Sequence, residues 1–245
     1  MRLSPLVACF LFISWSEHLC AEQLPEMRPA LIGTGSRSWI NLINTERLMK
    51  KGQKDAMVMF TCGVADLGDC FGIVFYRGTP GCEPLAHEAL EEVKRAYFVP
   101  AVYNYQKRNA LLHGTIVYRV VGGQPRLRIY LNQEKEHLLH GDDFISPQPV
   151  FVPGTKFRGL RYPNEGIGRA ANVVVRLTVD ATGELKGSQV IFETPPGKGF
   201  GAEFVSGIKD MTFLPGYLHG EPVACSANWE IIASGAGRGE QWKPD

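Results

Sequence analysis

One long pattern occurs twice in this chain, and the two copies are separated by a constant 115 positions, as from Gly68 to Gly183. Each copy has apolar residues at every second position, a tight turn at the glycine, a second strand, an amphipathic helix and a Phe-x-Pro exit. The matching strand residues are Val58, Phe60, Cys62 and Val64 in the first copy and Val173, Val175, Leu177 and Val179 in the second. The matching helix residues are Leu85, Ala89, Val93 and Ala96 in the first copy and Phe200, Phe204, Ile208 and Met211 in the second. We therefore predict an α+β fold of two tandem β-β-α-β modules, each a small antiparallel sheet covered by one helix.

The chain ends and the junction between the copies set the other boundaries. Met1 and Arg2 precede a short apolar run and Ala21, a pattern typical of a cleaved secretory signal peptide over residues 1–21. The run is shorter than the about 20 residues that a membrane-spanning helix needs, so we expect an exported chain without a membrane span. We place the first module at 38–133, a linker at 134–153, the second module at 154–234 and a disordered Gly-rich tail at 235–245.

The first copy differs from the second after its helix. The stretch 103–108 is interpreted as an insertion, and the third strands are matched by placing Ile116 on Ala227. After a turn at 122–125, apolar residues alternate with arginines at 126 and 128, which predicts an extra hairpin strand. Outward arginines on an edge strand either protect it against aggregation or line a binding edge, and the sequence leaves both alternatives open.

Composition and motifs give no indication of catalysis. The formal net charge is +1, so the chain has no basic excess for binding nucleic acid or anionic lipid. Glu88 and Glu92 are expected on the outward face of the first helix, where nothing would bury them and acid-base chemistry is not favoured. His137 and His140 lack a second cluster of ligands and are assigned to a solvated linker rather than to a metal site. We expect no enzymatic activity, no catalytic residue, no metal and no cofactor.

Four cysteines remain after the signal peptide, at 62, 70, 82 and 225. Cys62 and Cys70 are expected on adjacent strands and on the same inward face of the first hairpin, so they are the pair that could form a disulfide in an exported protein. The alternative is that both are small buried apolar residues, and the sequence leaves this open.

The order of elements in the second copy resembles the C-terminal domain of TonB, the periplasmic energy transducer of Gram-negative bacteria. The resemblance is carried by Tyr162-Pro163, the strand 173–179, the turn at Gly183, Phe213-Leu214-Pro215 and a closing strand through Trp229. It covers about the last third of the chain, and the first copy looks like a diverged version without the Tyr-Pro pair. The membrane anchor and Pro-rich spacer of TonB have no counterpart here, so energy transduction by this chain alone is not expected.

The resemblance implies a non-enzymatic periplasmic protein linked to outer-membrane transport. It would bind a protein or peptide partner, such as a segment of an outer-membrane transporter, by adding it as a strand to a sheet edge. The candidate edge strand runs from Val223 to Ile232, and its partner-binding residues are Val223, Ser226, Asn228, Trp229 and Glu230. One alternative is a structural envelope protein that forms a homodimer through the same edges. Another is an enzyme whose reactive residues meet only in the folded chain.

Overall fold

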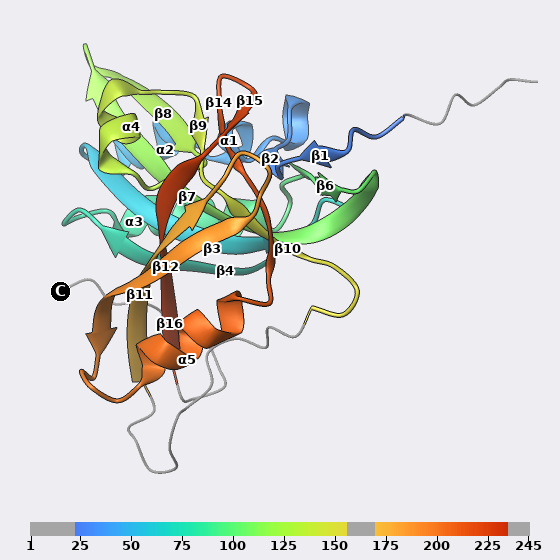
Figure 1. Cartoon of the computed structure of the whole chain (residues 1–245). Coiled ribbons are helices and arrows are strands. Elements are labelled where there is room, and N and C mark those ends of the chain that lie inside the picture. The colour runs from blue at the N-terminus through green and yellow to red at the C-terminus, as the bar shows by residue number, and fades with distance from the viewer. Residues whose placement is uncertain (1–22, 156–169, 235–245) are drawn as a thin grey trace, which may run out of the picture.

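Figure 1 shows the computed structural model of the chain, in which residues 23–155 and 170–234 are described. Strand accounts for 47% of the structure and helix for 20%, and the described strands form four sheets. The predicted α+β fold of two tandem β-β-α-β modules is therefore wrong, and the chain is β-rich. The physical reason is that short segments without a period-two pattern form additional strands, and those within 144–151 pair with strands of both halves of the chain.

The largest sheet is built around β7 (Gln106–Val121), whose 16 residues are long enough to pair with four other strands. These partners are β3 (Ala56–Val64), β6 (Ala101–Tyr103), β8 (Gln124–Tyr130) and β10 (Gln148–Phe151). The outer strands are β4 (Cys70–Gly78) beside β3, β1 (Met27–Arg28) beside β6 and β13 (Thr212–Leu214) beside β10. Because β13 comes from the second half of the chain, this sheet contains strands of both halves.

A helix, α3 (Glu83–Val93), covers one face of this sheet. Its buried stripe of Leu85, Ala89 and Val93 belongs to the same core as the inward residues of β3. Trp39, in α1 (Trp39–Leu42), is fully buried beside them; its ring lies 4.9 Å from that of Phe60, and its indole N–H donates to the Ala89 carbonyl at 3.0 Å. The other helices here are the 3-10 helix η1 (Gly35–Arg37) and α2 (Thr45–Lys50).

The second half contains a separate three-stranded sheet in the order β12-β11-β16. Its strands are β11 (Ala170–Val179), β12 (Leu185–Thr194) and β16 (Cys225–Ser234), and α5 (Phe200–Ile208) packs on β11 and β12. In β11, Val175 and Leu177 are buried while Arg176 between them is exposed, which confirms the strand predicted from the period-two pattern. Phe200, Phe204 and Ile208 of α5 complete the core on that face.

The sequence repeat is reproduced in the structure at two glycines. Gly68 has a φ of +91° and Gly183 a φ of +87°, a conformation that favours glycine. A Cβ added at Gly68 would lie 2.4 Å from the carbonyl oxygen of Phe98, and one added at Gly183 would lie 2.3 Å from that of Phe213. Each turn therefore packs against the Phe-x-Pro exit of its own copy. The two copies share this substructure even though they do not form separate modules.

The third strand of each copy corrects the predicted match. Val58 of β3 pairs with Ile116 of β7, and Val173 of β11 pairs with Ile231 of β16. Ile116 therefore corresponds to Ile231, and matching it with Ala227 was wrong. The offset of 115 positions continues into the third strand without a gap.

The turn before the third strand explains why no insertion is needed. Asn104 and Tyr105 both have positive φ, at 51° and 58°, between β6 and β7. The positions 115 residues later, His219 and Gly220, also both have positive φ, at 53° and 85°. The same tight hairpin turn is thus built with Asn-Tyr in the first copy and His-Gly in the second.

The segment expected as a linker, 134–153, joins the two halves through paired strands. It contains α4 (Lys135–His140), β9 (Phe144–Ile145) and β10. β10 pairs with β7 on one side and β13 on the other, and the Gln148 side chain exchanges hydrogen bonds of 2.7 and 2.9 Å with the backbone N–H and carbonyl of Ala30. The remaining short strands are β14 (Gly216–Leu218), which pairs with β9 and with β15 (Glu221–Val223), and β2 (Leu31–Ile32), which pairs with β5 (Phe98–Val99).

Some predicted features fall outside the described ranges. These are the signal peptide at 1–21, the tail at 235–245, and Tyr162 and Pro163. Within the two described ranges, no helix has both the length and the apolar character needed to cross a membrane.

Candidate functional site

β16 contains most of the predicted partner-binding edge. It pairs with β11 along its whole length, from Ser234 opposite Ala170 to Cys225 opposite Val179. No strand in the described part of the chain pairs with its other side. Four of the predicted edge residues lie on β16, and the fifth, Val223, is the last residue of β15.

The outer side of β16 is nevertheless engaged by its own chain. The backbone N–H of Asn228 points away from β11 and donates to the Glu134 carboxylate at 3.1 Å. The Glu230 carboxylate is buried, accepts a hydrogen bond of 2.7 Å from the Asn172 side chain and pairs with Arg77 Nε at 3.1 Å. A carboxylate placed against an edge strand competes with an incoming strand for its N–H groups. β16 is therefore the less available edge of its sheet.

Trp229 belongs to the core. It is buried, and its ring lies 5.1 Å from that of Phe204 and 6.4 Å from that of Phe213, both in edge-to-face arrangements. Its ring also lies 5.8 Å from that of His113 on β7. Trp229 thus connects the core of the second half to the large sheet.

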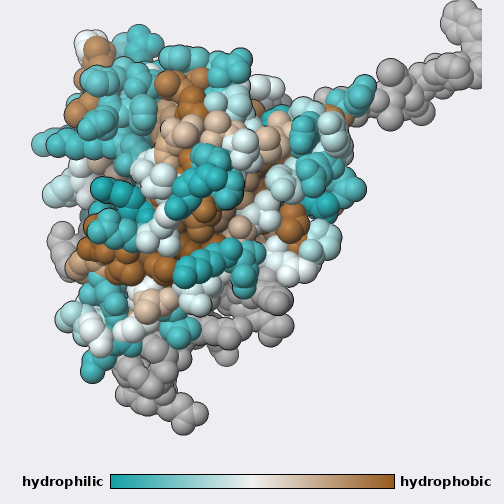
Figure 2. Space-filling model, viewed as in Figure 1, coloured by the Kyte–Doolittle hydropathy of each residue, from teal (hydrophilic) through white to brown (hydrophobic). Residues whose placement is uncertain are grey.

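β12, at the opposite edge of the three-stranded sheet, is open within the described structure. It pairs with β11 alone among the described strands. Three consecutive apolar side chains on it are exposed: Val190 by 37%, Ile191 by 46% and Phe192 by 48%. Figure 2 shows hydrophobic surface where β12 crosses the molecule in this view. An exposed, apolar edge strand of ten residues is a natural site for pairing with another strand.

The register indicates which backbone groups of β12 are free. Because Asn228 directs its N–H away from β11, the alternation of an antiparallel ladder directs the N–H of its partner Arg176 towards β12. Gln189, opposite Arg176, then directs its N–H towards β11, and the neighbouring Ser188 directs its N–H outward. The register shifts at Lys186 and at Ile191, so the regular part of the edge spans residues 187–190.

The first copy has a similar strand at the matching place. β4 pairs with β3 alone among the described strands, and it exposes Phe71 by 46% and Val74 by 44%. Both copies therefore present apolar side chains on their second strand.

The exposed residues of β12 are absent from the site predicted from sequence, although the sequence carries a signal for them. Side chains alternate between the two faces of a strand, so the apolar run Val190-Ile191-Phe192 must direct apolar side chains to both faces. Only one face of that sheet is covered by a helix. The sequence analysis placed the binding edge on the last strand instead, because the resemblance to TonB indicates that strand.

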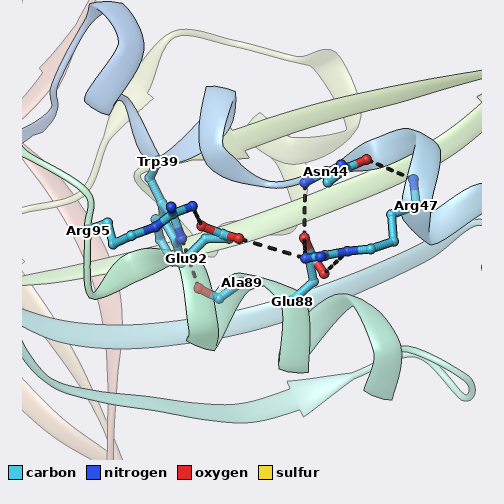
Figure 3. Close-up of polar contacts among 7 residues, drawn as sticks. All are labelled: Trp39, Asn44, Arg47, Glu88, Ala89, Glu92 and Arg95. Atoms are coloured by element: carbon cyan, nitrogen blue, oxygen red, sulfur yellow. Dashed lines mark hydrogen bonds and ion pairs between the residues drawn. The ribbon is translucent and has the colours of Figure 1, made fainter.

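The acidic face of α3 is structural, as Figure 3 shows. Glu88 is 4% exposed, and its carboxylate accepts hydrogen bonds from Arg47 Nε at 3.0 Å and from the backbone N–H of Asn44 at 3.2 Å. This interaction with Glu88 raises the pKa of Arg47. Glu92 pairs with Arg95 and lies 3.7 Å from Arg47. The expectation that Glu88 faces outward is wrong, because α2 covers it, and its carboxylate fastens α2 to α3.

His113 is the one buried histidine among the described residues. It is 6% exposed, and neither ring nitrogen has a hydrogen-bond partner in the described structure. Burial lowers the pKa of His113 to about 4. The imidazole is therefore neutral at physiological pH and acts as an aromatic contact for Trp229.

The four described cysteines are free thiols. Cys70 pairs with Val64, which places Cys62 diagonally across the same hairpin. The hydrogen bond between the two thiols, together with burial, raises the pKa of Cys62 well above its ordinary value. Burial raises the pKa of Cys225 to about 11, so that thiol is a poor nucleophile. A disulfide between Cys62 and Cys70 stays a prediction.

No group of three or more metal-ligating side chains occurs in the described ranges. His137 contacts Asp142 at 2.9 Å and stacks on Phe144 with ring centres 4.0 Å apart, so it is held within the fold. Comparisons with known protein families, curated proteins and solved structures found no match to this chain. The main feature of the candidate site is the apolar edge of β12.

Proposed function

We propose that this protein is an exported, non-enzymatic binding protein that adds an extended segment of a protein partner to its sheet as an extra strand at β12. The observation that carries the proposal is the outer edge of β12, which pairs with no described strand and exposes Val190, Ile191 and Phe192. Backbone hydrogen bonds would supply affinity, and contacts with these exposed side chains would favour apolar residues in the partner. A segment of an outer-membrane transporter is one such partner.

The open edge of β12 favours this strand over β16 as the binding edge. The N–H of Ser188 is directed outward, and no described carboxylate accepts a hydrogen bond from it, whereas Asn228 of β16 already donates to Glu134. An incoming strand would have to displace Glu134 from the backbone N–H of Asn228 on β16.

The test compares proline and alanine at the same edge position. Ser188→Pro removes an outward N–H and leaves the ladder with β11 intact, whereas Ser188→Ala keeps the N–H. Ser226→Pro and Ser226→Ala form the same pair on β16. We expect an envelope-extract pull-down to lose a specific partner with Ser188→Pro alone. Loss with Ser226→Pro alone would move the site to β16, and an unchanged partner set with both would rule out strand addition.

Self-association is the second candidate, favoured by the same exposed apolar edge. Two copies of β12 could pair with each other and form a homodimer. Sedimentation of the purified protein separates the two proposals. A dimer that Ser188→Pro converts to a monomer supports self-association, and a monomer over the whole concentration range excludes it.

A further inference from the structure

A cleft of about 790 Å³ is lined by residues of β3, β7, β8 and α4. Its volume lies within the range of about 300 to 1,000 Å³ that is usual for small-molecule sites. Part of its lining is apolar: Met57, Met59 and Val117 are half-buried, and Leu139 of α4 is 69% exposed. It shares no lining residue with β12, so it is a site separate from the proposed binding edge.

Positive charge is concentrated around this cleft. Its lining contains Arg119, Arg126, Arg128 and Lys135 and one acidic residue, Asp55, so four positive charges face one negative charge. None of the four cations forms an ion pair with any described residue. The whole chain has a net charge of only +1, so this local excess of three is a property of the cleft and not of the surface in general.

The arginines oppose one another across the ladder. Arg119 of β7 lies directly opposite Arg126 of β8, where Cβ atoms are about 5 Å apart and like charges destabilise the sheet. Arg128 is the diagonal neighbour on β8, and its guanidinium lies 5.1 Å over the ring of Tyr130. An anion between the guanidinium groups converts this repulsion into attraction, because each group can donate two parallel hydrogen bonds to phosphate or carboxylate oxygens.

We propose that this cleft binds a small amphiphilic anion. Its phosphate or carboxylate headgroup lies between Arg119 and Arg126, and its apolar chain lies on Met57, Met59 and Leu139. The apolar floor explains why the ligand is an amphiphile, since a free inorganic anion would leave that surface in water. The outward arginines of β8, which the sequence assigns either to protection of an edge or to binding, thus have a binding role.

The experiment is calorimetric titration of the purified full chain with dodecyl phosphate, laurate and inorganic phosphate, the amphiphiles below their micellar concentrations. Binding by dodecyl phosphate or laurate supports the proposal, and the tighter of the two identifies the headgroup. The double variant Arg119→Gln, Arg126→Gln is expected to bind at least about tenfold more weakly, because two charge-assisted contacts are lost. Lys94→Gln, an exposed position on α3, changes the net charge away from the cleft and is expected to bind like the unmodified protein.

Thermal unfolding of the double variant without ligand tests whether the two substitutions disturb the fold. Removing two opposed charges is expected to leave the midpoint of thermal unfolding unchanged or higher, whereas a structural role of these arginines would lower it. The proposal is overturned if neither amphiphile binds, if the double variant binds as tightly as the unmodified protein, or if inorganic phosphate binds as tightly as dodecyl phosphate.

Discussion

The two copies of the strand-turn-strand-helix substructure have the same local fold but different neighbours. In the first copy, β3 lies beside β7, which also pairs with β6, β8 and β10, and the helix α3 is fastened to α2 through Glu88. In the second copy, β11 lies beside β16, which pairs with no other described strand, and its other neighbour β12 is an exposed edge. The comparison teaches that both copies leave their second strand at an edge, whereas the third strand is the centre of a large sheet in the first copy and an edge strand in the second.

Removal of each core tryptophan tests whether the two halves are stable separately. Trp39→Ala and Trp229→Ala each remove a buried indole and are expected to lower the free energy of unfolding by about 3–5 kcal/mol. Because β10 pairs with strands of both halves, we expect one transition in chemical denaturation, shifted by either variant. Two transitions, each shifted by only one variant, would show that the halves unfold independently.

His113 and Asn228 occupy matching positions in the third strands of the two copies, but only the histidine can bind a proton at mildly acidic pH. Burial lowers the pKa of His113 from 6.5 to about 4, so below pH 6.5 the unfolded chain binds a proton that the folded chain does not. The free energy of unfolding should therefore fall between about pH 6.5 and pH 4, by on the order of 3 kcal/mol from this group. His113→Phe keeps an aromatic contact with Trp229 and should remove that part of the pH dependence in denaturant titrations. An unchanged pH profile in the variant would mean that His113 is accessible to protons in the folded state.

The turn glycines test how closely the copies share their packing. Gly183→Ala adds a Cβ at positive φ and against the Phe213 carbonyl, and it should destabilise the protein by about 1–3 kcal/mol. Gly68→Ala is expected to cost a similar amount, because its contact with Phe98 is equivalent. Gly187→Ala is the matched control, since nothing lies within 4 Å of its added Cβ. Equal thermal stability of Gly183→Ala and Gly187→Ala would contradict the turn geometry.

The smallest effect is expected at a position where the two turns differ, Asp180 in the second copy and Ala65 in the first. The Asp180 carboxylate accepts hydrogen bonds from the backbone N–H groups of Thr182 and Glu184 at 2.9 Å. The Thr182 hydroxyl also donates to this carboxylate and has the largest effect on its pKa. Together with the backbone hydrogen bonds, it holds the pKa of Asp180 below its ordinary value. Asp180→Ala should lower the thermal midpoint slightly at pH 7, and the difference should vanish as the pH falls through the folded pKa. A difference that persists when the carboxylate is protonated would assign the effect to packing.

Features that depend on local sequence could be predicted, and those that depend on distant pairing could not. The alternation of Val173, Val175 and Leu177 and the apolar stripe of α3 follow from their own spacing, and the structure contains both. The two-residue strands, such as β2 and β9, are too short for any periodicity to show, and they form because a partner lies far away in the sequence. The apolar residues Phe144, Ile145, Val150 and Phe151 indicate an extended segment lying on one or both halves, but no local signal shows which distant strands β9 and β10 pair with.

The candidate site shows the same limit. Alternation correctly places Glu230 on the opposite face from Trp229, but only the folded chain brings Arg77 against that face and buries the carboxylate. The opposition of Arg119 and Arg126 follows from the hairpin turn, whereas the cleft beside them requires the packing of α4. A carboxylate from 94 positions earlier, Glu134, occupies the edge that the resemblance favoured.

The amide of Gln148 exchanges both of its hydrogen bonds with the peptide groups of Ala30, at a distance of 118 positions along the chain. A fragment that stops at residue 133 would keep Ala30 and lose the side chain that satisfies it, and it would also uncover the flank of β7 now occupied by β10. The two halves of the chain are therefore not interchangeable. Deleting either half would leave backbone N–H and carbonyl groups of the remaining half without their hydrogen-bond partners.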